Sequence, residues 1–257
     1  MVITNNQLRG SSMIRQLFRA RRRQVLIDIG TQKDLFLAEG SYCIRNHRRI
    51  LANVRRIMAW ARSRNVPVIS ICEVHPRSNG VTTEPQTYPA YCIDGTEGQQ
   101  KIRYTLLANR LDLPADSKGD LPEDILRRYR QIILHSRCPD PFDEPRIDRL
   151  LSEMRAGEFI LIGAEAEGSV KATALGLLQR GKKVSVVVDA VGSHNKTQGR
   201  LSFRKMNARG AALLETKKLA GTSHLMGAGI CHCRSCRQQF QNQKLKSQST
   251  VKVAAEI

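Results

Sequence analysis

Residues 158–189, which read EFILIGAEAEGSVKATALGLLQRGKKVSVVVD, decide the fold. The short apolar runs at 158–163 and 183–189 are typical of strands buried on both faces. Between them, residues 167–179 carry apolar side chains at helical spacing, and Gly181 follows as the residue type that ends a helix in a left-handed turn. A strand, a helix and a second strand in this order predict a parallel pair joined by a right-handed crossover.

The same alternation extends over most of the chain. Further strands are expected at 24–29, 67–72, 131–135 and 211–215, and further helices at 44–64, 121–129 (with Asp120 as its N-cap), 147–154 and 199–210. Residues 73–117 show no sustained period, and we expect a long irregular connection there with one short helix at most. The sequence therefore predicts an α/β fold, a three-layer α/β/α sandwich with a mainly parallel, Rossmann-like sheet of about six strands.

Length and composition favour one soluble domain in the cytoplasm. Of the 257 residues, 24–225 are expected to form this domain, preceded by a basic leader at 1–23 and followed at 226–257 by a flexible tail that is Cys-rich and then polar. No stretch approaches the ~20 apolar residues of a membrane span, and the leader lacks the apolar run of a secretory signal. Seven cysteines is an odd number, and four of them (Cys43, Cys72, Cys92 and Cys138) are scattered singly, which does not suggest a disulfide framework, so a reducing compartment is expected.

The charge of the chain is strongly positive. A formal net charge of +19 and a pI near 10.2 favour nonspecific attraction of polyanions, and one face of the expected helix at 44–64 is rich in arginine. A basic nucleic-acid-binding module is therefore one hypothesis. The other interpretation is a generally basic, solvated exterior, which is favoured because aromatic residues make up only 5% of the chain and no RNA-binding motif is present.

Four segments together resemble one enzyme family, the isochorismatase-like cysteine hydrolases. The segments are Thr31–Leu35, Arg137–Phe142, Gly163–Ala174 and Val187–Ala190, of which the third is the specific one. The resemblance covers roughly residues 24–219. It implies a three-layer α/β fold, cleavage of small amides, imines or vinyl ethers, and assembly into homo-oligomers.

In this family an Asp, a Lys and a Cys at the ends of three neighbouring strands carry out the chemistry, with the thiolate as the nucleophile. The resemblance assigns the Cys position to Ser169, the Lys position to Ser136 and the Asp position to Gly30. A one-residue slip would place Arg137 at the Lys position. A register with two inserted residues would instead make Asp28 the family Asp, but residues 28 and 30 of a strand lie ~6.6 Å apart.

A serine at position 169 changes the expected chemistry. Serine has no thiolate to populate near neutral pH, and it depends on a correctly placed general base. The sequence offers no obvious base, because His135, beside Ser136, should point to the opposite face of its strand as a core or interlayer histidine. We therefore expect a catalytically impaired protein that acts by ligand binding or assembly. The alternative is an active hydrolase of a small amide or ester that uses Ser169 with Asp28 or with a positioned water.

Two segments of the sequence carry residue types that bind metals. Nicotinamidase-type members bind a metal through an Asp and histidines, and only Glu73 and His75 occupy the matching region, where an ordinary loop pair is the favoured interpretation. In the tail, Cys231, Cys233 and Cys236, with His224 as a fourth ligand, could hold zinc. A reactive, unstructured Cys-rich tail is favoured over this zinc site, so no cofactor is expected.

Overall fold

The computed structural model describes residues 24–77, 89–115, 121–122 and 124–221. Its strands are β1 Val25–Ile29, β2 Val68–Glu73, β3 Arg110–Leu113, β4 Gln131–Ser136, β5 Phe159–Gly163, β6 Val184–Val191 and β7 Ala212–Leu214. Its α-helices are α2 Lys33–Phe36, α3 His47–Ser63, α4 Ile125–Arg128, α5 Pro145–Glu153, α6 Ser169–Gln179, α7 Lys196–Ala208 and α8 Thr216–Ala220. Two 3-10 helices, η1 Arg103–Thr105 and η2 Pro141–Asp143, complete the described part. None of its helices has the length and apolar character needed to cross a membrane.

The strands form one sheet in the order β3-β4-β2-β1-β5-β6-β7, and every neighbouring pair is parallel. This arrangement confirms the α/β class and the parallel sheet. The prediction of about six strands was one short, because β3 lies inside the stretch 73–117 that was expected to be irregular. β3 has only four residues and alternates Arg110 and Asp112 with two leucines at the sheet edge, so it lacks the apolar run that marks a buried strand.

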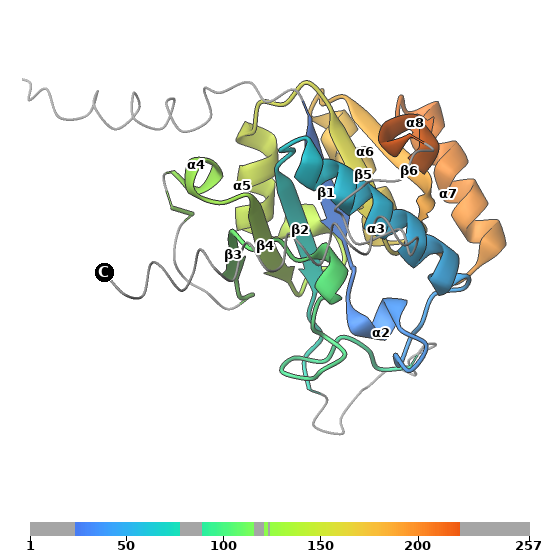
Figure 1. Cartoon of the computed structure of the whole chain (residues 1–257). Helices are drawn as coiled ribbons and strands as arrows, with labels where there is room; N and C mark the ends of the chain where they lie inside the picture. The colour runs from blue at the N-terminus through green and yellow to red at the C-terminus, as the bar shows by residue number, and fades with distance from the viewer. Residues whose placement is uncertain (1–23, 78–88, 116–120, 123, 222–257) are drawn as a thin grey trace, which may run out of the picture.

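Helices cover both faces of the sheet, as Figure 1 shows. Val25, Ile27 and Ile29 of β1 belong to a core cluster that also contains side chains of α4, α5, α6 and α7. Leu26, on the other face of the same strand, belongs to a second cluster with side chains of α2, α3 and α8. A strand buried on both faces reads as a nearly continuous apolar run, interrupted in β1 only by Asp28, which is why β1 and β5 were predicted correctly.

Helix limits differ from the prediction where capping residues decide them. α7 begins at Lys196 rather than at 199, because the Asn195 side chain accepts hydrogen bonds from the backbone N–H groups of Thr197 and Gln198. α5 begins at Pro145, a residue type suited to the first helical position. The expected helix at 121–129 is described only as the short α4, and its proposed cap Asp120 lies outside the described residues.

The chain reverses direction across the sheet at β1. From β1 it moves outward to β2 and then to the edge strand β3, returns to β4 between them, and later passes through β5, β6 and β7 on the other side. In open α/β sheets of this kind, ligands bind beyond the carboxyl ends of the strands at such a switch point. The ends of β1, β2 and β5 therefore define the region in which a site is expected.

Candidate active site

Ser169 and Glu73 are in contact at the switch point. Ser169 is the first residue of α6, which follows β5, and Glu73 is the last residue of β2. The Ser169 hydroxyl, in a residue only 7% exposed, donates a hydrogen bond to Oε1 of Glu73. From the sequence, Glu73 was expected only in a loop pair with His75, and no base was expected for Ser169. The position of Glu73 directly after the expected strand 67–72 was the signal that could have identified it.

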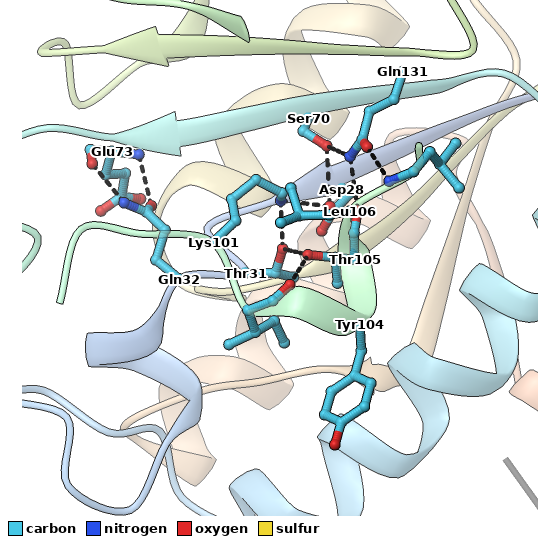
Figure 2. Close-up of polar contacts among 12 residues, drawn as sticks. Asp28, Thr31, Gln32, Ser70, Glu73, Lys101, Tyr104, Thr105, Leu106 and Gln131 are labelled. Atoms are coloured by element: carbon cyan, nitrogen blue, oxygen red, sulfur yellow. Dashed lines mark hydrogen bonds and ion pairs between the residues drawn. The ribbon is translucent and has the colours of Figure 1, made fainter. Parts of the chain in front are cut away.

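Glu73 is fixed by two other side chains. The Tyr91 hydroxyl donates to Glu73 Oε2 at 3.0 Å, so both carboxylate oxygens have a partner. The side-chain amide of Gln32 donates from Nε2 to the Glu73 carbonyl oxygen and accepts at Oε1 from the Glu73 N–H, both at 2.8 Å (Figure 2). These bonds restrain both the backbone and the carboxylate of Glu73.

Aromatic rings lie beside this pair. Tyr42 stacks on His194 with centroids 3.6 Å apart, and the Tyr42 and Tyr91 rings are 4.9 Å apart. Tyr91 in turn lies 4.6 Å from the His75 ring. The His194 Nε2 atom is 3.1 Å from Oε1 of Glu165, which follows β5. The site therefore combines flat side chains with two carboxylates, those of Glu73 and Glu165.

Burial keeps one phenol and two thiols of this region in their protonated forms. Burial, reinforced by the carboxylates of Glu73 and Glu165, raises the pKa of Tyr91, so this phenol stays a neutral donor at neutral pH. Burial also raises the pKa of the Cys72 thiol to about 12 and that of the Cys92 thiol well above its usual range. Neither of these two buried cysteines can supply the thiolate that position 169 lacks.

Gly30 directly follows β1, and Ser136 is the last residue of β4. Gly30 has φ +57°, and a Cβ built on it would lie 2.6 Å from the Ala164 carbonyl oxygen. A side chain at this position therefore requires the backbone around Ala164 to shift. Ser136 is buried, and its hydroxyl oxygen accepts from the Cys138 N–H at 3.0 Å.

Asp28 belongs to a buried polar network beneath the site. Its Oδ2 atom accepts from Lys101 Nζ at 2.7 Å and from the Ser70 hydroxyl at 3.1 Å (Figure 2). Lys101 Nζ also donates to the Thr31 hydroxyl at 2.6 Å, and Gln131 Nε2 donates to Ser70 Oγ at 2.8 Å. The structure thus brings Asp28 to Lys101 and not to Ser169. Lys101 was not predicted as a partner of Asp28, because it lies in the connection at 73–117, where no periodic pattern indicates which residues are buried.

His135 and the metal candidates have different environments. His135 Nε2 lies 2.8 Å from Asp112 Oδ1 of the edge strand β3, and its side chain is 17% exposed, so it is a partly exposed contact rather than a core histidine. In the described part of the chain, no group of three or more His, Cys, Asp or Glu side chains is arranged to hold a metal ion. Cys231, Cys233, Cys236 and His224 lie outside the described residues.

Comparisons with known proteins agree with this architecture. The isochorismatase domain family matches residues 24–218. The nicotinamidase of Escherichia coli is 26% identical over 210 residues, which cover 75% of this chain and 93% of that protein. Isochorismatase domain-containing protein 2 of Danio rerio is 23% identical over 65% of this chain and 64% of its own length.

Solved structures show the same fold. The nicotinamidase/pyrazinamidase of Bacillus subtilis superposes with a TM-score of 0.61 at 19% identity, over 75% of this chain and all of that one. PnC1 from L. infantum, in complex with nicotinate, superposes with a TM-score of 0.58 at 16% identity, over 76% of this chain and 93% of that one. Because the family match spans most of the chain, the protein belongs to the isochorismatase family.

Proposed function

We propose that this protein binds a small planar amide at the Ser169–Glu73 site and does not hydrolyse it by cysteine chemistry. The observation that carries this proposal is the hydrogen bond from the Ser169 hydroxyl to the Glu73 carboxylate. It places a polar anchor, rather than a thiolate, at the position that the family resemblance assigns to the nucleophile.

The residues at all three positions that the family resemblance assigns to the catalytic Cys, Lys and Asp support the loss of the thiolate mechanism. Ser169 has no sulfur, Ser136 has no ammonium group, and Gly30 has no carboxylate. The space at Gly30 is also limited, because a Cβ there would contact the Ala164 carbonyl oxygen at 2.6 Å. Nucleophilic catalysis needs the attacking group and its base together, so changes at all three positions remove more than one part of the mechanism.

The choice of ligand rests on the rings and the carboxylates. Stacked Tyr42 and His194, with Tyr91 4.9 Å from Tyr42, provide flat surfaces that suit a planar ring. The carboxylates of Glu73 and Glu165 are acceptors suited to the N–H groups of an amide. The Escherichia coli relative is a nicotinamidase, so nicotinamide is the first compound to test.

A second function is favoured by the same hydrogen bond. Glu73 could take the Ser169 proton while Oγ attacks an amide or ester carbonyl carbon, and then return it to the leaving nitrogen or oxygen as the C–N or C–O bond breaks. The resulting acyl-serine would be released by water. Ser169 opens α6, so its backbone N–H has no acceptor within the helix and could meet the developing oxyanion.

Calorimetric titration with nicotinamide, together with an assay for released ammonia, separates these functions. We expect wild-type protein to bind nicotinamide without releasing ammonia, and Glu73→Gln to weaken binding at least tenfold. Glu97→Gln, which alters an exposed carboxylate bound to Lys33, is the matched control and should bind like the wild type. Ammonia release that Ser169→Ala abolishes would establish the hydrolase instead. Absence of binding at millimolar nicotinamide would contradict the binding proposal.

A further inference from the structure

A cavity lies beside the starts of α3 and α7, and none of its lining residues belongs to the Ser169–Glu73 site. Its volume is about 640 Å³, within the range of small-molecule pockets. The lining residues are Arg45, Asn46, Ile50, Val191, Gly192, Ser193, Lys196, Gly199, Arg200 and Phe203. They come from the segment before α3, the first turn of α3, the end of β6 with the two residues after it, and the first eight residues of α7.

Close backbone contacts hold the two sides of the cavity together. The Arg45 N–H donates to the Ser193 carbonyl oxygen at 3.3 Å, which joins the segment before α3 to the segment after β6. Gly199 lets α7 approach that second segment, because a Cβ at this position would lie 2.7 Å from Ser193 Oγ. The cavity is therefore built from fixed backbone and not from long side chains alone.

The charge of the lining is entirely positive. Arg45, Lys196 and Arg200 line the cavity, and no carboxylate does. Within the described residues, none of these three side chains forms an ion pair or a hydrogen bond. The nearby carboxylate of Glu167 instead accepts from the backbone N–H groups of His194 and Asn195. Three uncompensated cations around one cavity create a field that favours a multiply charged anion.

The rest of the lining suits a flat organic group. Ile50 and Val191 are buried apolar residues, and the half-buried Phe203 adds an aromatic ring. The Asn46 amide can both donate and accept hydrogen bonds at the edge of such a group. A phosphate alone would leave this apolar surface unused, whereas a nucleotide would combine its phosphate with a planar base.

We propose that this cavity binds a nucleotide, with the phosphate between Arg45, Lys196 and Arg200 and the base against Ile50 and Phe203. The same chemistry is offered by a free mononucleotide and by the 5′-phosphorylated end of a nucleic acid strand. The proposal is independent of the Ser169–Glu73 site, and substitutions at the cavity test it without touching that site.

The test is fluorescence anisotropy and calorimetry on the full chain with AMP, adenosine, and a short single-stranded RNA with or without a 5′-phosphate. The pocket variant is the double substitution Lys196→Gln and Arg200→Gln. Its matched control is Arg204→Gln with Lys205→Gln, which removes the same charge from exposed positions of α7 that do not line the cavity. Both variants therefore have the same net charge and differ only in where the charge was removed.

We expect AMP to bind at least tenfold more tightly than adenosine, and the pocket variant to lose at least tenfold in AMP affinity while the control loses less than threefold. Tighter binding of AMP than of the phosphorylated RNA would identify a free nucleotide as the ligand of the cavity. Tighter binding of the phosphorylated RNA would identify the end of a strand. An equal loss of AMP affinity in the two variants would overturn the proposal, because AMP would then be attracted by the overall positive charge of the protein and not by the cavity. Equal binding of AMP and adenosine, or no AMP binding at millimolar concentration, would also overturn it.

Discussion

The side-chain amide of Gln32 binds both backbone groups of Glu73, donating from Nε2 to the carbonyl oxygen and accepting at Oε1 from the N–H, each at 2.8 Å. Gln32 is fully buried and lies three residues after the end of β1, whereas Glu73 ends the neighbouring β2. The same Nε2 atom also donates to the Gln99 carbonyl oxygen at 2.8 Å. One amide therefore joins three segments and aligns the carboxylate that accepts from Ser169.

We expect Gln32→Ala to lower the free energy of unfolding by ~2–3 kcal/mol, because it leaves buried backbone groups of Glu73 without partners. It should also weaken nicotinamide binding, since Glu73 loses its restraint. Chemical denaturation and calorimetry measure the two effects. Gln100→Ala, which removes an exposed amide bound to Lys33, is the control and should change neither quantity much. Unaltered nicotinamide affinity in Gln32→Ala would show that Gln32 supports the fold alone.

The Asp28–Lys101 pair predicts a strong dependence of stability on both partners. The two side chains are 0% and 4% exposed, and their charged atoms are 2.7 Å apart. Replacing one partner leaves a buried charge unpaired, so Asp28→Asn and Lys101→Met should each cost ~3–5 kcal/mol in urea denaturation. The double variant should be more stable than the sum of the two losses predicts. Strict additivity would contradict direct coupling, and Lys33→Met in the exposed pair with Glu97 is the control.

The buried strands could be predicted from the sequence because burial on both faces leaves a continuous apolar run. Four residues of β3, with exposed Arg110 and Asp112, gave no such signal. The positions of Ser169, Ser136 and Gly30 followed from the family resemblance, and the structure places all three at the carboxyl end of the sheet. Local pattern alone did not connect Glu73 with Ser169 or Lys101 with Asp28, because those contacts join residues 96 and 73 positions apart.

We expect that the catalytic Asp of the family cannot be restored at position 30 by a single substitution of Gly30. Its φ of +57° and the 2.6 Å approach of a Cβ to the Ala164 carbonyl oxygen both oppose a side chain. We expect Gly30→Ala to lower the free energy of unfolding by roughly 3 kcal/mol, combining left-handed strain with overpacking. Gly181→Ala is the matched control: Gly181 has φ +67° with nothing within 4 Å of its Cβ, so only the strain of ~1–2 kcal/mol is expected.

The cost of a side chain at position 30 can also be measured with all three family residues restored. Gly30→Asp combined with Ser136→Lys and Ser169→Cys should unfold more readily than the pair Ser136→Lys and Ser169→Cys, measured by urea denaturation. If Gly30→Ala proved no more destabilising than Gly181→Ala, the contact with Ala164 would have to relax easily, and the carboxylate could then be restored.

The buried phenol of Tyr91 should make the free energy of unfolding fall at alkaline pH. Burial raises its pKa, with the carboxylates of Glu73 and Glu165 adding to the effect, while the unfolded tyrosine titrates near ~10. Above about pH 10 the unfolded chain releases this proton and the folded chain keeps it, so the free energy of unfolding falls as the pH rises. The contribution of Tyr91 to the free energy of unfolding is fully present below the pKa of the unfolded tyrosine. It decreases as the pH rises towards the pKa of the folded tyrosine.

Urea denaturation between ~pH 9 and ~pH 11 checks this dependence. We expect Tyr91→Phe to have a shallower decline than the wild type, because phenylalanine has no proton to release. The buried thiols Cys72 and Cys92 contribute a decline of the same sign in both proteins, so the slope should not vanish. Tyr104→Phe alters a tyrosine that is 38% exposed and should keep the wild-type slope. Equal slopes for Tyr91→Phe and the wild type would mean that the phenol gains access to water before the chain unfolds.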